Sequence, residues 1–212
     1  MQVAVNLLIA LAAAFLGTSQ AAVRASSMSF DDAEALAAVF AHPRILGEME
    51  EWSRVSEIRS PVFLVVRDAV PICAEPRDES LPCVPREHLT GFVRDEGLQQ
   101  RLGSAFSATV CQQLASSFEQ RNSTGHSLPA LPHPRIEFIE YEALLRSFES
   151  GAYRGRARGY AQFSLPGYTE DGKALVYAAY SCGGLCGGGS LFLLARTEGV
   201  WRVVHWTSVW VS

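Results

Sequence analysis

Apolar residues recur at helical spacing in two segments of the N-terminal half of the chain. In Ser29 to Ala41 three of them fall on one face, and the following His42-Pro43 pair ends the pattern. In Ser104 to Gln120 an apolar residue returns at every fourth position: Phe106, Val110, Leu114 and Phe118. The two segments therefore predict two amphipathic helices. Cys111 lies on the flank of the second helix, and we expect it to be buried and unreactive.

The remaining apolar segments have the patterns of β-strands. Val62 to Val66 is a continuous apolar run, which is typical of a buried strand. Arg135 to Glu140 alternates like a strand, and the apolar spacing from Tyr141 to Phe148 predicts a short helix after it. Four further strands are expected, with glycine-containing turns between them: Gly159 to Leu165, Lys173 to Ser181, Ser190 to Arg196 and Val200 to Val211.

These elements predict an α+β fold. Because the connections between the last four strands are short, neighbouring strands must run antiparallel, as a four-stranded meander. Two or three helices, mostly from the N-terminal half, are expected to pack on this sheet. Both faces of the last strand are largely apolar, so we expect a strand that is interior to the sheet or covered on both sides, with Trp210 in the core. A single domain is expected over 22–212, with a helical half at about 28–121, a proline-rich loop at 121–134 and a β-rich half at 135–212.

Residues 1–21 are predicted to be a signal peptide. Val3 to Leu16 is an apolar run interrupted only by Asn6, and the small residues around Ser19 and Ala21 suit cleavage after Ala21. The run is shorter than the roughly 20 apolar residues that a transmembrane helix needs, and no other segment reaches that length. The mature protein is therefore expected to be secreted or periplasmic, with no membrane span.

Composition and charge exclude some classes of function. A hydrophobic fraction of 48% with 19% charged residues is sufficient for a folded core. A net charge of −4 and a pI near 5.7 lack the basic footprint of a nucleic-acid-binding protein. The sequence also lacks the short motifs of serine hydrolases, zinc proteases and dinucleotide-binding folds. We therefore assign no catalytic residue, metal or cofactor.

Export changes how the five cysteines are interpreted, because an oxidising compartment permits disulfides. Cys73 and Cys83 enclose a proline-rich polar loop, and a bridge between them is expected to constrain that loop. Since five is an odd number, at least one thiol stays free or pairs with another chain. Because Cys182 and Cys186 are expected to form a second bridge, as argued below, the expected free cysteine is Cys111.

The last fifty residues contain a distinctive series of short motifs. In chain order they are Phe163-Ser164, Gly167-Tyr168, the strand from Ala174 to Tyr177, the segment from Cys182 to Gly189, Gly199, Trp201, Val203 and the terminal Trp210-Val211-Ser212. This series resembles the tail of a family of uncharacterised secreted bacterial proteins. The resemblance implies export and a shared fold unit, and it carries over no activity and no catalytic residue.

The arrangement of Cys182 and Cys186 depends on the loop between them. A three-residue loop would place the two cysteines opposite each other, within disulfide range. A type I′ turn at Gly183-Gly184 would instead point them to opposite faces of the hairpin. The three-residue loop would put Leu185, which carries a Cβ, at a position that prefers left-handed geometry, and a wider loop running into Gly187 to Gly189 would relieve this. We favour the bridge. A thiol-redox site is less favoured, because such sites usually have C-x-x-C at a helix N-terminus.

Other residues are candidates for binding. The glycines Gly187, Gly188 and Gly189 carry no side chains, so their backbone could admit a ligand or a partner strand closely. A zinc site at the cysteines would need further ligands, such as His126 and His133.

Arg154, Arg156 and Arg158 alternate, and an extended backbone would set three guanidinium groups on one face, suited to a carboxylate or phosphate. The same pattern is typical of a solvated, charged sheet edge.

The function that fits these features best is a non-catalytic module of the cell envelope. It would bind a small molecule or an envelope protein through a groove on the sheet. The alternative is a hydrolase or thiol-redox enzyme that uses a cysteine or His205, although a single histidine among Val and Trp is more often a core residue. A deep pocket that holds His205 or Cys111 beside a carboxylate would favour the enzyme.

Overall fold

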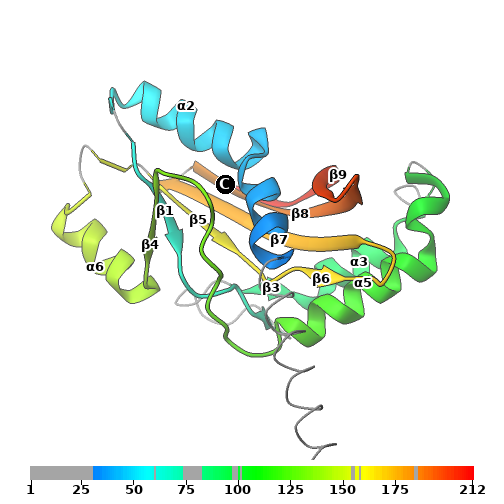
Figure 1. Cartoon of the computed structure of the whole chain (residues 1–212). Helices are drawn as coiled ribbons and strands as arrows, with labels where there is room; N and C mark the ends of the chain where they lie inside the picture. The colour runs from blue at the N-terminus through cyan, green and yellow to red at the C-terminus, as the bar shows by residue number, and fades with distance from the viewer. Residues whose placement is uncertain are drawn as a thin grey trace, which may run out of the picture.

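The structure is a computed structural model of the chain, and it describes residues 31–59, 61–73, 83–96, 100, 102–153, 156–157, 159–183 and 186–212. In this part of the chain, helices pack on both faces of one large sheet (Figure 1). The predicted signal peptide and the first two residues of the first predicted helix lie outside the described residues.

The described residues form helices and strands in mixed order up to residue 150, and strands after it. The helices are a segment over 31–40, the π-helical turn η1 (Pro43–Gly47), α2 (Glu48–Val55), α3 (Arg86–Arg94), the 3-10 turn η2 (Gly103–Phe106), α5 (Ala108–Arg121) and α6 (Tyr141–Ser150). The strands are β1 (Phe63–Val66), β2 (Ile72–Cys73), β3 (Val84–Pro85), β4 (Ile136–Ile139), β5 (Tyr160–Phe163), β6 (Gly167–Tyr168), β7 (Lys173–Gly183), β8 (Cys186–Thr197) and β9 (Val200–Val211).

The helices agree in part with the sequence pattern. The segment over 31–40 and α6 match two predicted helices. The predicted helix from Ser104 begins only at Ala108, because the Ser107 Oγ caps it by accepting a hydrogen bond from the Val110 N–H at 3.5 Å. α2 and α3 lie in segments where the apolar spacing predicts no helix.

The large sheet has seven strands, so the predicted four-stranded meander is incomplete. Its order is β4-β1-β5-β7-β8-β9, and β6 pairs with β7. The antiparallel meander is present as β5, β7, β8 and β9, but β1 and β4 extend it in parallel: Val65 of β1 pairs with Ala161 of β5 and with Phe138 of β4. The N-terminal half is therefore not only helical, because it supplies β1 to the interior of the sheet.

Helices cover both faces of this sheet. The segment over 31–40, η1 and α2 cover one face, where the buried residues include Leu36, Ile45, Met49, Val176 and Phe192. α3 and α5 cover the other face, where the buried residues include Leu89, Leu114, Phe118, Leu175 and Leu191. α6 packs against the end of the sheet formed by β1 and β4, with a third buried cluster around Leu64 and Leu144. None of the helices in the described ranges is long and apolar enough to cross a membrane.

The prediction that the last strand is interior is wrong. β9 is an edge strand of the described sheet: seven of its twelve side chains are exposed, four are half-buried, and Trp201 is buried, at 5%. Trp210, expected in the core, is 39% exposed. Two register shifts against β8 leave Val204 and Val209 without an opposite residue, as in β-bulges. Trp201 and Val203 still pack on one buried cluster and Val209 on the other, so β9 is an edge strand that is partly covered on each face.

We predict that Gly167→Ala destabilises the fold. At Gly167 a Cβ atom would lie 2.6 Å from the Phe118 Cα, so α5 would have to move away from β6. We expect a loss of about 1–3 kcal/mol in the free energy of unfolding, as for other overpacked sites, measured by denaturant titration. Gly125→Ala is the matched control, because a Cβ there meets no atom within 4 Å. Equal stability of the two variants would contradict the packing described.

Candidate functional site

Both predicted cysteine pairs lie at disulfide distance. Cys73 at the end of β2 pairs with Cys83, which precedes β3, and their Cα atoms are 5.7 Å apart. Cys182 and Cys186 pair across the β7–β8 hairpin, with their Cα atoms 5.2 Å apart. Residues 74–82, which the first bridge encloses, lie outside the described residues.

The β7–β8 hairpin differs from each of the loops expected for it. Gly183 is paired with Cys186, and the register shifts between Ser181 and Gly183. Cys182 is therefore an extra residue on β7, and this irregularity lets it reach Cys186 although the two cysteines are not opposite each other. A repeating strand pattern gives no signal for such an irregularity, so the sequence indicates the bridge but not its geometry.

Cys111 is the free cysteine of the described residues, and it is unsuited to act as a nucleophile. Its side chain is fully buried among the apolar residues beneath α5, and the Sγ contacts the Phe106 carbonyl oxygen at 3.5 Å. Burial raises the pKa of the Cys111 thiol, because the charged thiolate is poorly solvated there. A reactive cysteine needs the opposite, an accessible thiol with a lowered pKa.

The glycine segment of β8 is covered by the protein's own side chains. Gly187, Gly188 and Gly189 are buried, and a Cβ at Gly189 would collide with the Trp210 indole and the Tyr177 hydroxyl. The Trp210 Nε1 donates a hydrogen bond of 2.8 Å to that hydroxyl. The absence of a side chain at Gly189 thus makes room for the Trp210 indole. The indole occupies the space in which a ligand was expected to approach the glycines.

The predicted arginine face is described only at Arg156. Arg154 and Arg158 lie outside the described residues. Arg156 lies in a turn, where its N–H donates to the Tyr153 carbonyl, and its guanidinium is 3.3 Å from a Glu137 carboxylate oxygen. This contact favours a solvated ion pair at Arg156 over a ligand contact.

The candidate histidines are also separate from the cysteines. His126 contacts the Thr124 hydroxyl at 2.9 Å, and His133 packs its ring against Phe40 and Phe63. Burial, and then the charge of Arg135, lower the pKa of His133. His205 lies on β9 opposite Leu193. Within the described ranges, no three His, Cys, Asp or Glu side chains are grouped as metal ligands.

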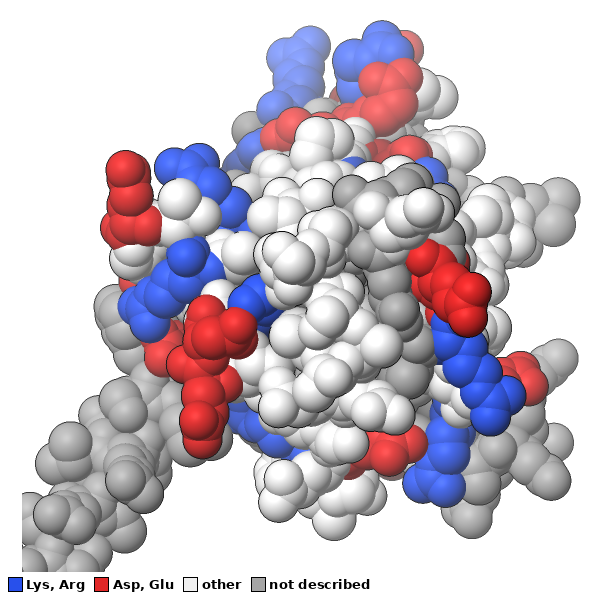
Figure 2. Space-filling model, turned by 90° about the vertical axis from the view of Figure 1, so that its right-hand side faces the viewer, with Lys and Arg blue, Asp and Glu red and all other residues white. Residues whose placement is uncertain are grey.

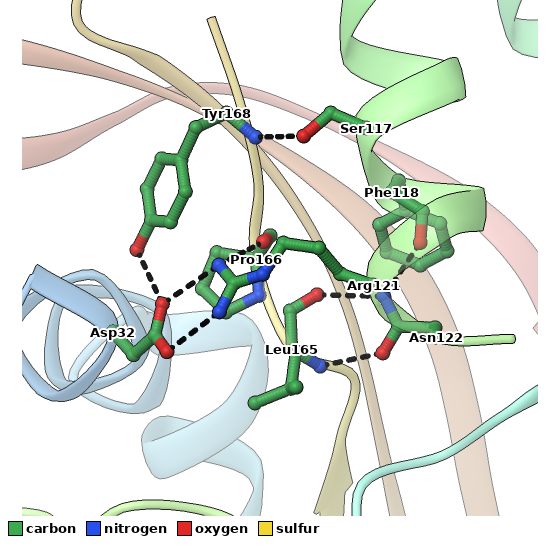
Figure 3. A network of polar contacts seen from close by, with 8 residues as sticks. All are labelled: Asp32, Ser117, Phe118, Arg121, Asn122, Leu165, Pro166 and Tyr168. Atoms are coloured by element: carbon green, nitrogen blue, oxygen red, sulfur yellow. Dashed lines mark hydrogen bonds and ion pairs between the residues drawn. The ribbon is translucent and has the colours of Figure 1, made fainter. Parts of the chain in front are cut away.

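A buried ion pair joins three distant parts of the chain (Figure 3). Arg121 at the end of α5 donates two hydrogen bonds, of 2.9 and 2.8 Å, to the Asp32 carboxylate and a third to the Pro166 carbonyl. The Tyr168 hydroxyl donates to the same carboxylate at 3.0 Å. Burial, followed by the Asp32 charge, raises the pKa of Tyr168. Burial alone would lower the pKa of Arg121, but its bond to Asp32 raises it.

The neighbouring Asn122 extends this network. Its amide donates to the carbonyls of Phe118 and Leu165 and accepts a bond from the Leu165 N–H, all at 2.8–2.9 Å. Apart from the local bond to Phe118, the side-chain bonds of Arg121 and Asn122 thus join α5 to other parts of the chain. We conclude that it fixes α5 to the helix over 31–40 and to the segment before β6, and that it is a structural feature.

Two hollows in the described residues are small or shallow. One, beside Trp52 and Cys182, has a volume of about 10 Å³, and the other, of about 500 Å³, is an open polar depression along α5. Neither is lined by His205, by Cys111 or by a carboxylate. They do not form the deep pocket that would favour a hydrolase or thiol-redox enzyme.

The most conspicuous uncovered feature is an apolar surface along β9. Five of the nine large apolar side chains that are exposed in the described residues lie there, and we call them the β9 surface: Val200, Val204, Trp206, Trp210 and Val211. Figure 2 views the molecule from the side where β9 lies in Figure 1, and it shows a broad area without charged side chains, with Lys, Arg, Asp and Glu around it. Apolar surface of this kind typically marks an interaction site.

Trp206, at the centre of the β9 surface, is contacted by Arg44 of η1. The Arg44 guanidinium carbon lies 5.3 Å from the Trp206 ring centroid and 5.8 Å from that of Tyr180. Arg44 also contacts the Glu48 carboxylate at 3.5 Å, so its charge is compensated. These contacts position the indole while 38% of Trp206 stays exposed. The tryptophans of β9 are evident in the sequence, but no sequence pattern indicates that the side chain of Trp206 is exposed.

Comparison with protein-family models, with curated proteins and with solved structures found no match for this chain.

We predict that Asp32→Ala strongly destabilises the protein. The substitution leaves the buried Arg121 charge without its carboxylate, and breaking a buried pair in this way costs about 3–5 kcal/mol. The thermal midpoint and the denaturant midpoint should both fall. Glu51→Ala is the control, because it removes an exposed pair with Arg54 and should leave both midpoints unchanged. Similar midpoints for the two variants would contradict a structural role of the network.

We predict that Cys111 resists alkylation in the native state. Because burial shields the thiol and raises its pKa, iodoacetamide at pH 8 should modify it only after unfolding. Mass spectrometry should find no adduct on the native protein and one adduct on the non-reduced protein in denaturant. Equally fast modification in both states would show that the thiol is accessible.

Proposed function

We propose that this protein is an exported, non-catalytic domain of the cell envelope that binds a protein partner through the β9 surface. The observation that carries the proposal is the uncovered apolar strand at the edge of the sheet. Soluble proteins seldom leave a long apolar edge strand open, because it invites pairing with other chains. An open edge is therefore expected to have a partner.

The shape of the surface favours a protein over a small molecule. Small ligands are usually enclosed in concave pockets of about 300–1,000 Å³. β9 is instead an extended strand of 12 residues, about 40 Å long. Among the described strands it pairs only with β8, so its outer backbone groups are available to an added strand.

Export is supported by three features. Two cysteine pairs at disulfide distance fit an oxidising compartment. The apolar run from Val3 to Leu16 followed by small residues predicts a signal peptide. The resemblance of the C-terminal tail to secreted bacterial proteins agrees with the cysteine pairs and with the N-terminal run. Export itself stays a prediction.

Site-specific photo-cross-linking tests the proposal. A photoreactive residue at Val204, which is 46% exposed on β9, should form a covalent protein–protein adduct when cells that export the protein are illuminated. The same residue at Glu170, which is exposed in the turn after β6, is the control and should form none. Adducts at neither position, or equally at both, would contradict a specific partner at the β9 surface.

A further inference from the structure

We infer that His42 is a pH-sensitive switch for the β9 surface: its neutral imidazole holds Arg44 and Trp206 in place, and its protonated form does not. The inference rests on the proposed function, because it adds regulation to the same surface. It is carried by the hydrogen bond that the imidazole accepts from η1 and by the packing of the ring against Trp206.

His42 lies where the helix over 31–40 ends and η1 begins. Its N–H donates to the Val39 carbonyl, and its own carbonyl accepts from the Ile45 N–H. Its side chain caps η1, because the Nδ1 atom accepts a hydrogen bond of 3.2 Å from the Arg44 N–H. A backbone N–H can only donate, so Nδ1 must carry no proton and the imidazole must be neutral. Protonation puts a donor on both ring nitrogens and therefore removes this cap.

The imidazole ring also packs against the β9 surface. Its centroid lies 5.3 Å from that of Phe192 on β8 and 6.4 Å from that of Trp206, both in edge-on arrangements. The residue that it caps, Arg44, lies over the same indole. His42 thus supports Trp206 twice, through its own ring and through the backbone of Arg44. Loss of the cap therefore affects a side chain at the centre of the β9 surface.

The surroundings of His42 disfavour a positive charge. Burial lowers the pKa of His42, because the imidazolium is poorly solvated there. Arg44 and Glu48 are the charged neighbours on the same stretch of chain, and they contact each other at 3.5 Å. From β7, Tyr180 lies 5.8 Å from the Arg44 guanidinium carbon, and burial raises the pKa of Tyr180, so it stays neutral. Among these groups Glu48 already compensates Arg44, so an imidazolium would add a second positive charge beside it.

The charged groups of the other elements around His42 are directed elsewhere. On β9, Arg202 and His205 pair with β8 residues that pack beneath α5, so they lie on the opposite face of the sheet from Trp206. Acidic and basic side chains of the helices and of β8 contact each other, and the pairs are Asp31 and Glu34 with Arg196, Asp32 with Arg121, Glu50 with Arg135, and Glu51 with Arg54. A second histidine, His133, contacts the Phe40 ring near the end of the helix over 31–40. A variant changed at position 42 alone therefore separates its titration from that of His133 and His205.

Mild acid is expected to release the switch. The unfolded chain binds a proton at His42 near the ordinary pKa of about 6.5, and the folded protein binds it only at lower pH. His42 therefore contributes stability that is complete above the ordinary pKa and is lost as the pH falls through the lowered one. In the protonated protein η1 has lost its cap and two positive charges lie beside Trp206, so the surface that the partner binds is weakened.

A cap that does not titrate tests the switch. In His42→Asn the amide oxygen can accept the Arg44 N–H at every pH, and Asn is among the best N-cap residues, so the variant should fold like the wild type. NMR of the nitrogen-15-labelled mature protein follows the Trp206 indole N–H, which is assigned by its loss in Trp206→Phe. Between about pH 8 and about pH 4.5 the wild-type signal should shift with a midpoint below about 6.5, and the thermal midpoint should fall further than that of His42→Asn.

An indole signal that does not shift, or that shifts equally in His42→Asn, would overturn the inference, because His133 and His205 are unchanged in the variant. His42→Ser, which is also a good cap without a titrating ring, takes the place of His42→Asn if that variant does not fold.

Cross-linking from position 204 connects the switch to the partner. Cells that export the protein with a photoreactive residue in place of Val204 are illuminated at about pH 7.5 and at about pH 5, on either side of the ordinary pKa of histidine. The adduct yield should fall at least about threefold in acid, the factor expected from the loss of a helix cap, and His42→Asn should keep it. A yield that is independent of pH, or that falls equally in both proteins, overturns the regulation.

The failure of this inference is distinguishable from that of the proposed function. Adducts that form equally at both pH values leave the proposed function standing and exclude the switch. The absence of adducts at either pH contradicts the proposed function, whereas the NMR titration of the purified protein decides the role of His42 without a partner.

Discussion

The fold depends on the pairing of β1 between β4 and β5. All four residues of β1 are buried, and they form parallel ladders with strands that lie about 70 and 100 residues further along the chain. This one short strand brings the N-terminal segment into the same sheet as the C-terminal meander. The helices over 31–40 and in α2 can then cover one face of the meander, since they precede β1 directly in the chain.

The parts of the fold that depend on local sequence could be predicted. The continuous apolar run of β1, the helix over 31–40 and the strands of the meander each carry their own periodicity. The place of β1 in the sheet could not be predicted, because parallel pairing joins segments that are distant in the chain and leaves no local pattern. The exposure of β9 was misjudged for a related reason: Trp206 and Trp210 are apolar in the sequence whether a helix, a second chain or water lies above them.

The candidate site shows the same division between local and long-range information. The cysteine pairs follow from composition and compartment, and they are present at disulfide distance. The glycines of β8 are conspicuous in the sequence, but their neighbour is Trp210, more than twenty residues away. Likewise, nothing near Asp32 in the sequence indicates Arg121 as its partner. Contacts of this kind are decided by the packing of the whole sheet, and no local sequence pattern indicates them.

The position of Asn122 has a consequence for producing the protein. Asn122-Ser123-Thr124 is an acceptor sequence for N-linked glycans in a eukaryotic secretory pathway. The side chain is 1% exposed, and both its amide nitrogen and its oxygen are bonded to the backbone. A sugar on that nitrogen would have no space in the folded molecule, so glycosylation of the nascent chain and correct folding exclude each other. Expression in a bacterial host, or the substitution Thr124→Ala in yeast or mammalian cells, avoids this conflict.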